Sequence, residues 1–481
     1  MSAVIATPRI PSALLALRGE LLEIVGLEGV LDAADVATRS AGAFRDDSLQ
    51  AGLLVRPRST EEVSRVLRLC HAHGQSVVPQ GGRTGLVHGS DARPEQLILS
   101  LERMNRIEQI DPLQRIAVVQ AGVVLQTLQE AATEQDLFFP LDLGARGSAT
   151  LGGNVATNAG GNRVIRYGMT RDLVLGVEAV LADGTVLSSL NRMLKNNAGY
   201  DLKQLFIGTE GSLGIVTRAV LRLLERPRSQ NLALLAVDRF ADVVALLKFF
   251  DRRLGGALSA FEVMWRDFYQ LVTTPPARGS APLPQSHGWY VLVEAQGGDV
   301  GRDGALFQDV LAAALEEGLV VDAVVASSER ERAALWALRD DVQQTNRHGI
   351  AYMFDVSLPV AEMERYVGEV HAALRARWPD VHAWTFGHLG DGNLHIAVRP
   401  PGEGQQARLE VEEILYRPLA AFGGSVSAEH GIGEEKRAYL GLSRNAAEIA
   451  TMHTLKRALD PKGVLNPGKV IAEPATQDET P

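Results

Sequence analysis

The chain has 481 residues, of which 46% are hydrophobic and 22% are charged, and its formal net charge is −10. This composition is that of a globular protein of roughly two to four domains or one large enzyme, and it excludes a wholly disordered chain. The acidic balance argues against nucleic acid as a partner, because phosphates need clustered Lys and Arg. The single cysteine, Cys70, excludes an internal disulfide framework and fits a reducing compartment, so we expect a cytoplasmic protein.

From the sequence we expect neither a membrane span nor an export signal. The sequence contains no apolar run as long as a membrane span, and residues 1–8 lack the basic region that precedes the apolar stretch of a signal peptide. Residues 472–481 are polar and are expected to form a flexible tail.

A strand, a helix and a second strand open the interpretable part of the chain. Residues 53–55 and 76–79 have strand character, and the apolar spacing between them predicts a helix from Ser59 to Gly74. The second strand leads directly into a glycine-rich loop at 79–85. Further strands are predicted at 97–100, 117–121, 174–181 and 216–223.

Glycine is concentrated a second time between residues 143 and 168, where seven of 26 residues are Gly. Backbone N–H groups in glycine turns form concave donor sites for phosphate, so the loops at 79–85 and 147–161 suit a diphosphate. Neither loop has the Rossmann or Walker pattern. The alternative is that these glycines only form tight turns and close helix contacts; the same choice applies to residues 208–214, where glycines recur every three residues.

Composition changes near residues 225–229, where we place a domain boundary. The predicted order beyond it is strand, helix, two strands, helix and strand, which indicates a ferredoxin-like sandwich. The proline-rich residues 273–287 are expected to form a long surface loop inside this unit. Residues 329–348 are predicted to be another helix.

Two histidines flank an Asp-Gly turn signal at 391–392. A two-residue turn there would place His388 and His395 directly opposite each other, about 5 Å apart at Cβ. In the extended stretch 425–433, Glu429 and His430 would point to opposite sides, so Glu429 could complete a metal site while His430 faces a substrate. Two His and one carboxylate with open positions are typical of catalytic Zn²⁺ and are also compatible with Fe²⁺ or Mn²⁺. The alternative is a buried structural histidine and an accidental pairing.

Three polar groups have two interpretations each, and a fourth has one. Arg339 could bind a carboxylate or form a solvated ion pair on its helix. Asn393 could bind substrate or close the hairpin. Asn466 could contact a ligand or stabilise its turn. Lys436 is expected at a solvated helix start.

Several of these motifs resemble one family. The loop at 78–86 and the stretch 147–168 resemble the two FAD loops of vanillyl-alcohol-oxidase-type flavoproteins, and residues 208–216 also match. The motifs at 387–395 and 427–433 are similar to those of the metal-dependent, FAD-dependent D-2-hydroxy acid dehydrogenases, a group that includes D-2-hydroxyglutarate and D-lactate dehydrogenases and the glycolate oxidase flavin subunit. The resemblance spans residues 40 to 471.

The resemblance implies an α+β fold: a two-part FAD-binding domain (1–228), a ferredoxin-like cap that holds the substrate (229–424) and a C-terminal segment that returns to the FAD domain (425–471). It implies a divalent metal, zinc first, on His388, His395 and Glu429, with His430 as the catalytic base. It implies that Arg339 binds the substrate carboxylate and that Asn393 assists. The implied FAD-binding residues are Pro79, Gln80, Gly81, Gly82, Arg83, Thr84, Gly85, Gly147, Ser148, Thr150, Gly152, Gly153, Asn158, Ala159, Gly160, Gly161, Tyr167, Gly168, Gly214, Ile215 and Asn466.

Two substrate positions depart from the D-2-hydroxyglutarate pattern. Met353 stands where a Lys is usual, and Gln343 stands where a Thr is common. Members with a covalent flavin carry a His inside the first loop, where this chain has Arg83, so we expect non-covalent FAD.

The resemblance implies oxidation of a D-2-hydroxy acid to the 2-keto acid, with D-2-hydroxyglutarate expected first and D-lactate or a glycolate-like acid next. An electron-transfer flavoprotein, a quinone or a cytochrome would accept the electrons, and a homodimer is the base-rate expectation. Two alternatives stay open on the sequence alone: a metal-dependent hydrolase without flavin, and a non-catalytic flavin electron-transfer subunit.

Overall fold

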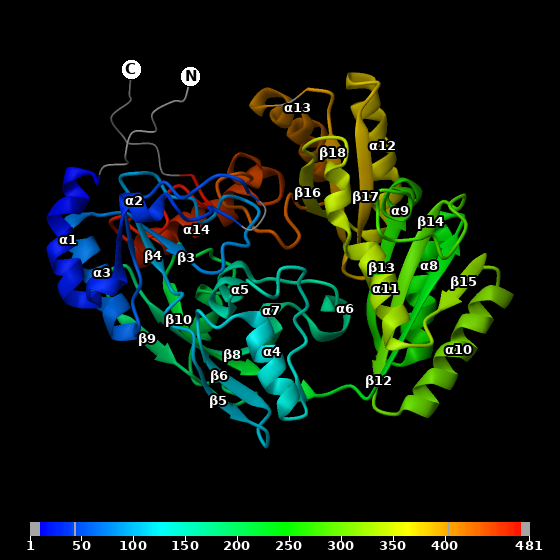
Figure 1. Cartoon of the computed structure of the whole chain (residues 1–481), viewed down its shortest axis with the longest axis horizontal. Coiled ribbons are helices and arrows are strands. Elements are labelled where there is room, and N and C mark those ends of the chain that lie inside the picture. The colour runs from blue at the N-terminus through cyan, green and yellow to red at the C-terminus, as the bar shows by residue number, and fades with distance from the viewer. Residues whose placement is uncertain (1–9, 43–44, 403, 473–481) are drawn as a thin grey trace.

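The computed structural model describes residues 10–42, 45–402 and 404–472. Two lobes lie side by side (Figure 1): the N-terminal half and the end of the chain form one, and the residues between them form the other. Residues 1–8, for which no export signal is expected, and residues 473–481 of the expected tail lie outside the described residues. No helix in the described ranges is long and apolar enough to cross a membrane.

A four-stranded sheet forms the first part of the N-terminal lobe. Its order is β1 (Val30–Asp32), β2 (Leu53–Val55), β4 (Leu97–Ser100) and β3 (Val77–Gln80). Helix α3 (Thr60–His73) connects β2 to β3, as predicted; Ser59 caps its start and Gly74 ends it in the left-handed conformation. Helix α1 (Ser12–Val25) packs beside α3, and their apolar side chains cover one face of this sheet.

A five-stranded antiparallel sheet forms the second part of this lobe. Its order is β5 (Ile107–Asp111), β6 (Ile116–Gln120), β10 (Ile215–Arg222), β8 (Val174–Val180) and β9 (Val186–Ser189). Helices α4 (Leu125–Glu134) and α5 (Leu151–Thr157) share an apolar core with it. The four strands predicted from the sequence correspond to β4, β6, β8 and β10. The smaller elements of the lobe are α2 (Ala33–Val36), α6 (Val164–Tyr167), α7 (Thr170–Leu173) and the ribbon of β7 (Leu137–Phe138) with β11 (Leu224–Glu225).

The second lobe is the predicted ferredoxin-like unit, extended by three strands. The seven-stranded sheet has the order β15 (Asp322–Val325), β12 (Ser229–Val237), β14 (Trp289–Gly297), β13 (Leu258–Trp265), β17 (His382–His388), β18 (Asn393–Arg399) and β16 (Tyr352–Ser357). The first four strands have the order 4-1-3-2 of the β-α-β-β-α-β motif. The sequence did not predict that the last three would continue the same sheet.

Helices cover both faces of this sheet. The larger apolar core includes α8 (Phe240–Leu254), α10 (Val300–Glu316), α12 (Met363–Arg377) and α13 (Gln405–Tyr416). Helices α9 (Arg266–Thr273) and α11 (Glu329–Asp340) pack on the opposite face. The helix predicted over 329–348 is therefore shorter than expected, because the chain turns into a 3-10 segment at Val342–Asn346.

The end of the chain returns to the N-terminal lobe. After α14 (Ala446–Leu459), the backbone of Val464 and Asn466 pairs with Val77 beside β3, at N–O distances of 2.7 and 2.8 Å. In Figure 1 this red segment lies among the blue strands. Leu465 is fully buried in the core of the first sheet.

Helix α6 of the N-terminal lobe contacts the cap. The Tyr167 hydroxyl donates to Gln296 Oε1 at 2.7 Å, and Arg166 donates to the Ala257 carbonyl at 3.1 Å. Arg163, just before α6, forms an ion pair with Glu294 of β14. These contacts hold the cap sheet against α6 of the N-terminal lobe.

Candidate active site

Both glycine-rich loops border one cavity of about 350 Å³ in the N-terminal lobe. The loops touch each other: a Cβ on Gly82 would lie 2.0 Å from the Ser148 carbonyl oxygen, and one on Gly81 would lie 2.5 Å from Thr150 Oγ1. Glycine is therefore required by close approach, and not merely by a turn. The predicted residues that line the cavity are Pro79, Gln80, Gly81, Gly82, Arg83, Thr84, Gly85, Thr150, Gly152, Gly153, Ala159, Gly160, Gly214 and Ile215.

The cavity wall carries buried polar atoms that fit a polar cofactor. Gln80 Nε2, Thr150 Oγ1 and Asn154 Nδ2 are buried and have no hydrogen-bond partner among the described residues. Buried polar groups are almost always hydrogen-bonded, so this concentration indicates a ligand with its own donors and acceptors. FAD, with its diphosphate and ring heteroatoms, meets that requirement.

The other residues predicted to bind FAD lie outside the cavity wall: Gly147, Ser148, Asn158, Gly161, Tyr167, Gly168 and Asn466. Tyr167 bonds to the cap instead. Asn466 Nδ2 donates to the carbonyls of Gly89 and Glu210, at 3.0 and 2.7 Å. Direct contact of these seven residues with FAD remains a prediction.

Glu210 is a residue of this region that the sequence analysis did not single out. Its buried carboxylate accepts hydrogen bonds from the backbone N–H groups of Ile432 (2.7 Å) and Gly433 (3.0 Å). Burial raises the pKa of this carboxyl, and the two N–H groups oppose that effect. Glu210 thereby ties the segment that follows His430 to the N-terminal lobe.

The predicted two-residue turn between the histidines is wrong. Strand β17 ends at His388, Leu389–Asp391 form a 3-10 turn, and Gly392 has φ +86°. His395 consequently lies opposite Phe386, two residues away from the expected partner. A shift of two preserves the face of the sheet, so both histidines still converge, with ring centroids 5.3 Å apart.

Glu429 and His430 meet the histidine pair. Glu429 Oε1 lies 3.7 Å from His388 Nε2 and 3.5 Å from His395 Nε2. His430 Nε2 lies 4.0 Å from the same oxygen. One potential ligand atom from each of Asp355, His395, Glu429 and His430 lies within 4.8 Å of the others. His388, the third predicted ligand, is not one of these four residues. Their nitrogen and oxygen donors are of the kind that bind a divalent cation such as Zn²⁺.

Asp355 fixes the segment that carries Glu429. Asp355 faces His395 across the β16–β18 pair, and its Oδ2 accepts from the backbone N–H groups of Ala428, Glu429 and His430 at 3.0–3.1 Å. Lys436 also donates to Asp355, to the backbone carbonyl at 3.1 Å. Lys436 is 1% exposed, so the expected solvated position is wrong: its charge is needed beside a buried carboxylate.

Burial and neighbouring charges shift the pKa values of the titratable groups around this cluster in different directions. Burial opposes protonation of His388, but the carboxylates of Glu262 and Glu429 raise its pKa to about 10. Burial lowers the pKa of His395 to about 3. Against the effect of burial, His388 and His395 lower the pKa of Glu429 to about 2. At neutral pH Glu429 is therefore ionised and His395 is neutral, as metal ligands must be, whereas His388 has to lose a proton before it can bind a metal.

Arg339 is buried and directed at this cluster. Its Nε donates to Glu262 Oε2 at 2.7 Å, and its Nη2 lies 3.1 Å from His388 Nε2. The expected alternative, a solvated ion pair on the helix face, is excluded by its 6% exposure. Asn393 Oδ1 is buried without a partner among the described residues.

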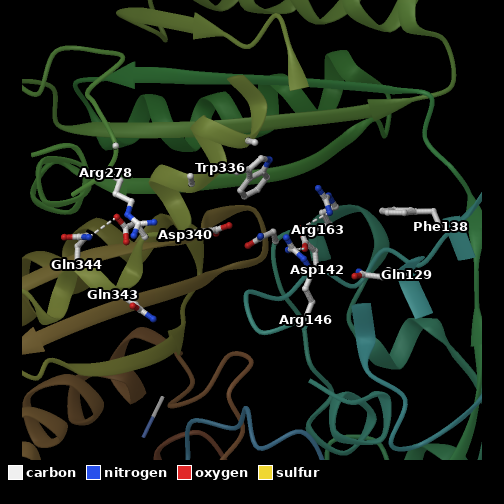
Figure 2. A pocket seen from close by; sticks show the side chains of 15 residues that line it. Gln129, Phe138, Asp142, Arg146, Arg163, Arg278, Trp336, Asp340, Gln343 and Gln344 are labelled. Carbon is white, nitrogen blue, oxygen red and sulfur yellow. Dashed lines mark hydrogen bonds and ion pairs between the residues drawn. The ribbon is translucent and has the colours of Figure 1, made fainter. Parts of the chain in front are cut away.

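Met353 and Gln343 occupy different surroundings. Met353 lies on β16 opposite Ala397, half-buried against the apolar core beneath α9 and α11. Gln343 borders a larger cavity of about 910 Å³ between the lobes. Figure 2 shows this cavity, with Gln343 and Asp340 on the cap and Asp142 and Arg146 on the other lobe. None of the four cluster residues lines this larger cavity, whereas Glu429 and His430 line the smaller one.

Comparisons with known proteins agree with this architecture. A model of the FAD-binding domain matches residues 51–189, and one described as "FAD linked oxidases, C-terminal domain" matches residues 226–470. The chain is 42% identical to D-2-hydroxyglutarate dehydrogenase, mitochondrial, of Rattus norvegicus over 87% of this chain and 78% of the relative. It is 41% identical to D-2-hydroxyglutarate dehydrogenase of Xanthomonas citri over 86% of this chain and 88% of the relative.

Solved structures with low sequence identity share the fold. The 4-ethylphenol oxidase of Gulosibacter chungangensis superposes with a TM-score of 0.75 at 20% identity, covering 97% of this chain and 98% of its own. p-Cresol methylhydroxylase gives 0.77 at 16% identity with the same coverage. These likenesses confirm the predicted fold class.

The fold and the cavity define a flavoprotein, with an FAD-binding domain and a ferredoxin-like cap. The chain belongs to the family of FAD-linked oxidases and is an oxidoreductase related to the D-2-hydroxyglutarate dehydrogenases. The hydrolase and the non-catalytic flavin subunit, the two alternatives from the sequence, are not favoured.

Proposed function

We propose that this enzyme uses FAD and a divalent metal to oxidise a D-2-hydroxy acid at its CH–OH carbon, with D-2-hydroxyglutarate as the first substrate and D-lactate or a glycolate-like acid next. One observation carries the proposal: Glu429 and His430 line the same cavity as the two glycine loops. A substrate held at the metal cluster would therefore face the cofactor. D-2-hydroxyglutarate is placed first because the relatives of this chain are named D-2-hydroxyglutarate dehydrogenase.

In this proposal His388, His395 and Glu429 hold the cation, with zinc preferred because two imidazoles and a carboxylate suit it. When bound, the metal lowers the pKa of the substrate hydroxyl, and FAD takes up two electrons with the Cα hydrogen. His430 Nε2 removes the hydroxyl proton. Asp355 Oδ2 lies 4.0 Å from His430 Nδ1, on the other side of the ring, and would stabilise the charged imidazole.

Arg339 is proposed to bind the substrate carboxylate. Its Nε is held by Glu262 and its Nη2 faces His388, and the remaining N–H groups of the terminal nitrogens would bind a planar anion. The unpartnered Asn393 Oδ1 supports a second polar contact to the substrate. Because Met353 supplies no positive charge, another residue must recognise the second carboxylate of D-2-hydroxyglutarate. Activity on D-lactate, which has one carboxylate, would be stronger than in an enzyme with Lys at this position.

FAD is proposed to be non-covalent. Among the described residues that line the cavity, His430 is the one histidine, and no cysteine or tyrosine is present. An electron-transfer flavoprotein, a quinone or a cytochrome is proposed to accept the electrons. The expected cytoplasmic location and homodimer stay predictions; the animal and plant relatives carry the word mitochondrial in their names.

Product identification tests the proposal. Zinc-supplemented protein is incubated with an artificial electron acceptor and, separately, with D- and L-2-hydroxyglutarate, D-lactate and glycolate. The proposal predicts 2-ketoglutarate from the D-enantiomer alone. Conversion of the L-enantiomer, or of none of these acids, would contradict it.

A further inference from the structure

Glu262 contacts both a proposed metal ligand and the proposed carboxylate-binding arginine. It lies on β13 directly opposite His388 of β17 and is 1% exposed. Its Oε1 is 2.7 Å from His388 Nδ1, and its Oε2 accepts from Arg339 Nε at 2.7 Å. Each oxygen therefore serves a different functional side chain.

These contacts select one tautomer of His388. A carboxylate beside Nδ1 requires a proton on that nitrogen, which leaves the lone pair of the neutral ring on Nε2. His388 Nε2 is the nitrogen that faces Glu429 Oε1, at 3.7 Å. A carboxylate that orients a ligating histidine in this way raises its basicity and fixes its ring plane.

The same carboxylate sets the orientation of Arg339. With Nε bound to Glu262, the plane of the guanidinium is fixed and its Nη2 is held 3.1 Å from His388 Nε2. Without Glu262, a cation buried at this depth would lack its main counter-charge. The positions of substrate carboxylate and metal are thus set by one side chain.

Resting on the function proposed above, we propose that Glu262 is a positioning residue that holds the metal ligand His388 and the substrate-binding Arg339 in register. Its loss would weaken metal affinity and raise KM together. A buried glutamate with a merely structural role would lower thermal stability and leave both constants unchanged.

Glu262→Gln is the discriminating substitution. An amide of the same shape can accept only one of the two hydrogen bonds, because its NH₂ group would meet either Arg339 Nε or His388 Nδ1 as a second donor. Glu294→Gln on the neighbouring strand is the matched control: Glu294 is 2% exposed and pairs with Arg163 away from the histidines. Glu262→Asp, with the carboxylate withdrawn by one methylene, serves if the amide variant does not fold.

Zinc affinity of the FAD-loaded proteins is measured by competition with a chromophoric chelator, and KM is measured at saturating zinc. For Glu262→Gln we expect zinc binding weakened 10–100-fold, KM raised at least tenfold and full FAD content. For the control Glu294→Gln we expect wild-type zinc affinity. Zinc Kd and KM within twofold of wild type would overturn this inference and leave the proposed function intact. If the wild-type protein binds neither zinc nor any other divalent metal, the proposed function is overturned instead.

Discussion

Arg163 of the FAD-binding lobe and the buried Glu294 of the cap form an ion pair, with Arg163 Nε 2.9 Å from Glu294 Oε1. Arg163 Nη1 also lies 2.8 Å from Asp142 Oδ2, and Figure 2 shows Arg163 beside Asp142 at the edge of the larger cavity. One guanidinium therefore connects the two lobes.

Arg163→Met should destabilise the protein by about 3 kcal/mol, because it leaves the Glu294 carboxylate buried without its cation. Thermal unfolding of the FAD-loaded protein measures the effect. Arg253→Met is the control: its pair with Glu317 is about half exposed and should contribute less than about 1 kcal/mol. Equal unfolding temperatures for the two variants would show that the buried pair does not hold the lobes.

Gly82→Ala should abolish FAD retention. The added methyl would lie 2.0 Å from the Ser148 carbonyl oxygen, so the two loops would be forced apart. The ratio of flavin to protein after gel filtration should fall at least tenfold. Gly368→Ala in α12 meets no atom within 4 Å and should retain all of its flavin. A Gly82→Ala protein that retains its full complement of FAD would refute the role of this contact.

His430→Asn should slow flavin reduction by about 10²-fold or more, following the usual magnitude of general-base catalysis. FAD and zinc content should stay at wild-type levels, since neither depends on this ring in the proposed site. Stopped-flow absorbance of the anaerobic protein measures the step, with His453→Asn on α14 as the control. Reduction at the wild-type rate would exclude His430 as the base.

His371 should make the cap less stable in acid. Burial lowers the pKa of His371 to about 4, and the ring bonds to Thr385 Oγ1 at 3.0 Å. Below the ordinary pKa of 6.5 the unfolded chain binds a proton that the folded chain does not, so stability falls as the pH drops.

The expected loss from this residue is about 2 kcal/mol between pH 7 and pH 5. Urea unfolding at the two pH values should show a smaller loss for His371→Gln than for wild type. His73→Gln, at an exposed position, should keep the wild-type dependence. An unchanged pH dependence in His371→Gln would contradict the assignment.

The sequence predicted those features that depend on local pattern. Apolar periodicity located α3 and the strands of both lobes, and the order of elements after residue 229 predicted the ferredoxin-like core. Glycine density located the two loops because close approach leaves no room for Cβ. The convergence of His388 with His395 followed from alternation along strands, which survived the error in the turn.

Long-range contacts explain what the sequence did not reveal. Glu262 and Lys436 looked like an ordinary strand residue and an ordinary surface charge, because nothing local shows that His388 or Asp355 lies beside them. Glu210 gave no signal for the same reason, since its partners are more than 200 residues away. Pairing of β13 with β17 brings Glu262 to His388, and strand order across a sheet is not a local property.

The visible spectrum of zinc-replete protein, recorded anaerobically before and after addition of D-2-hydroxyglutarate, tests the proposed function most directly. The flavin band should bleach as FAD is reduced. A flavin band that persists with this acid, with D-lactate and with glycolate would contradict it.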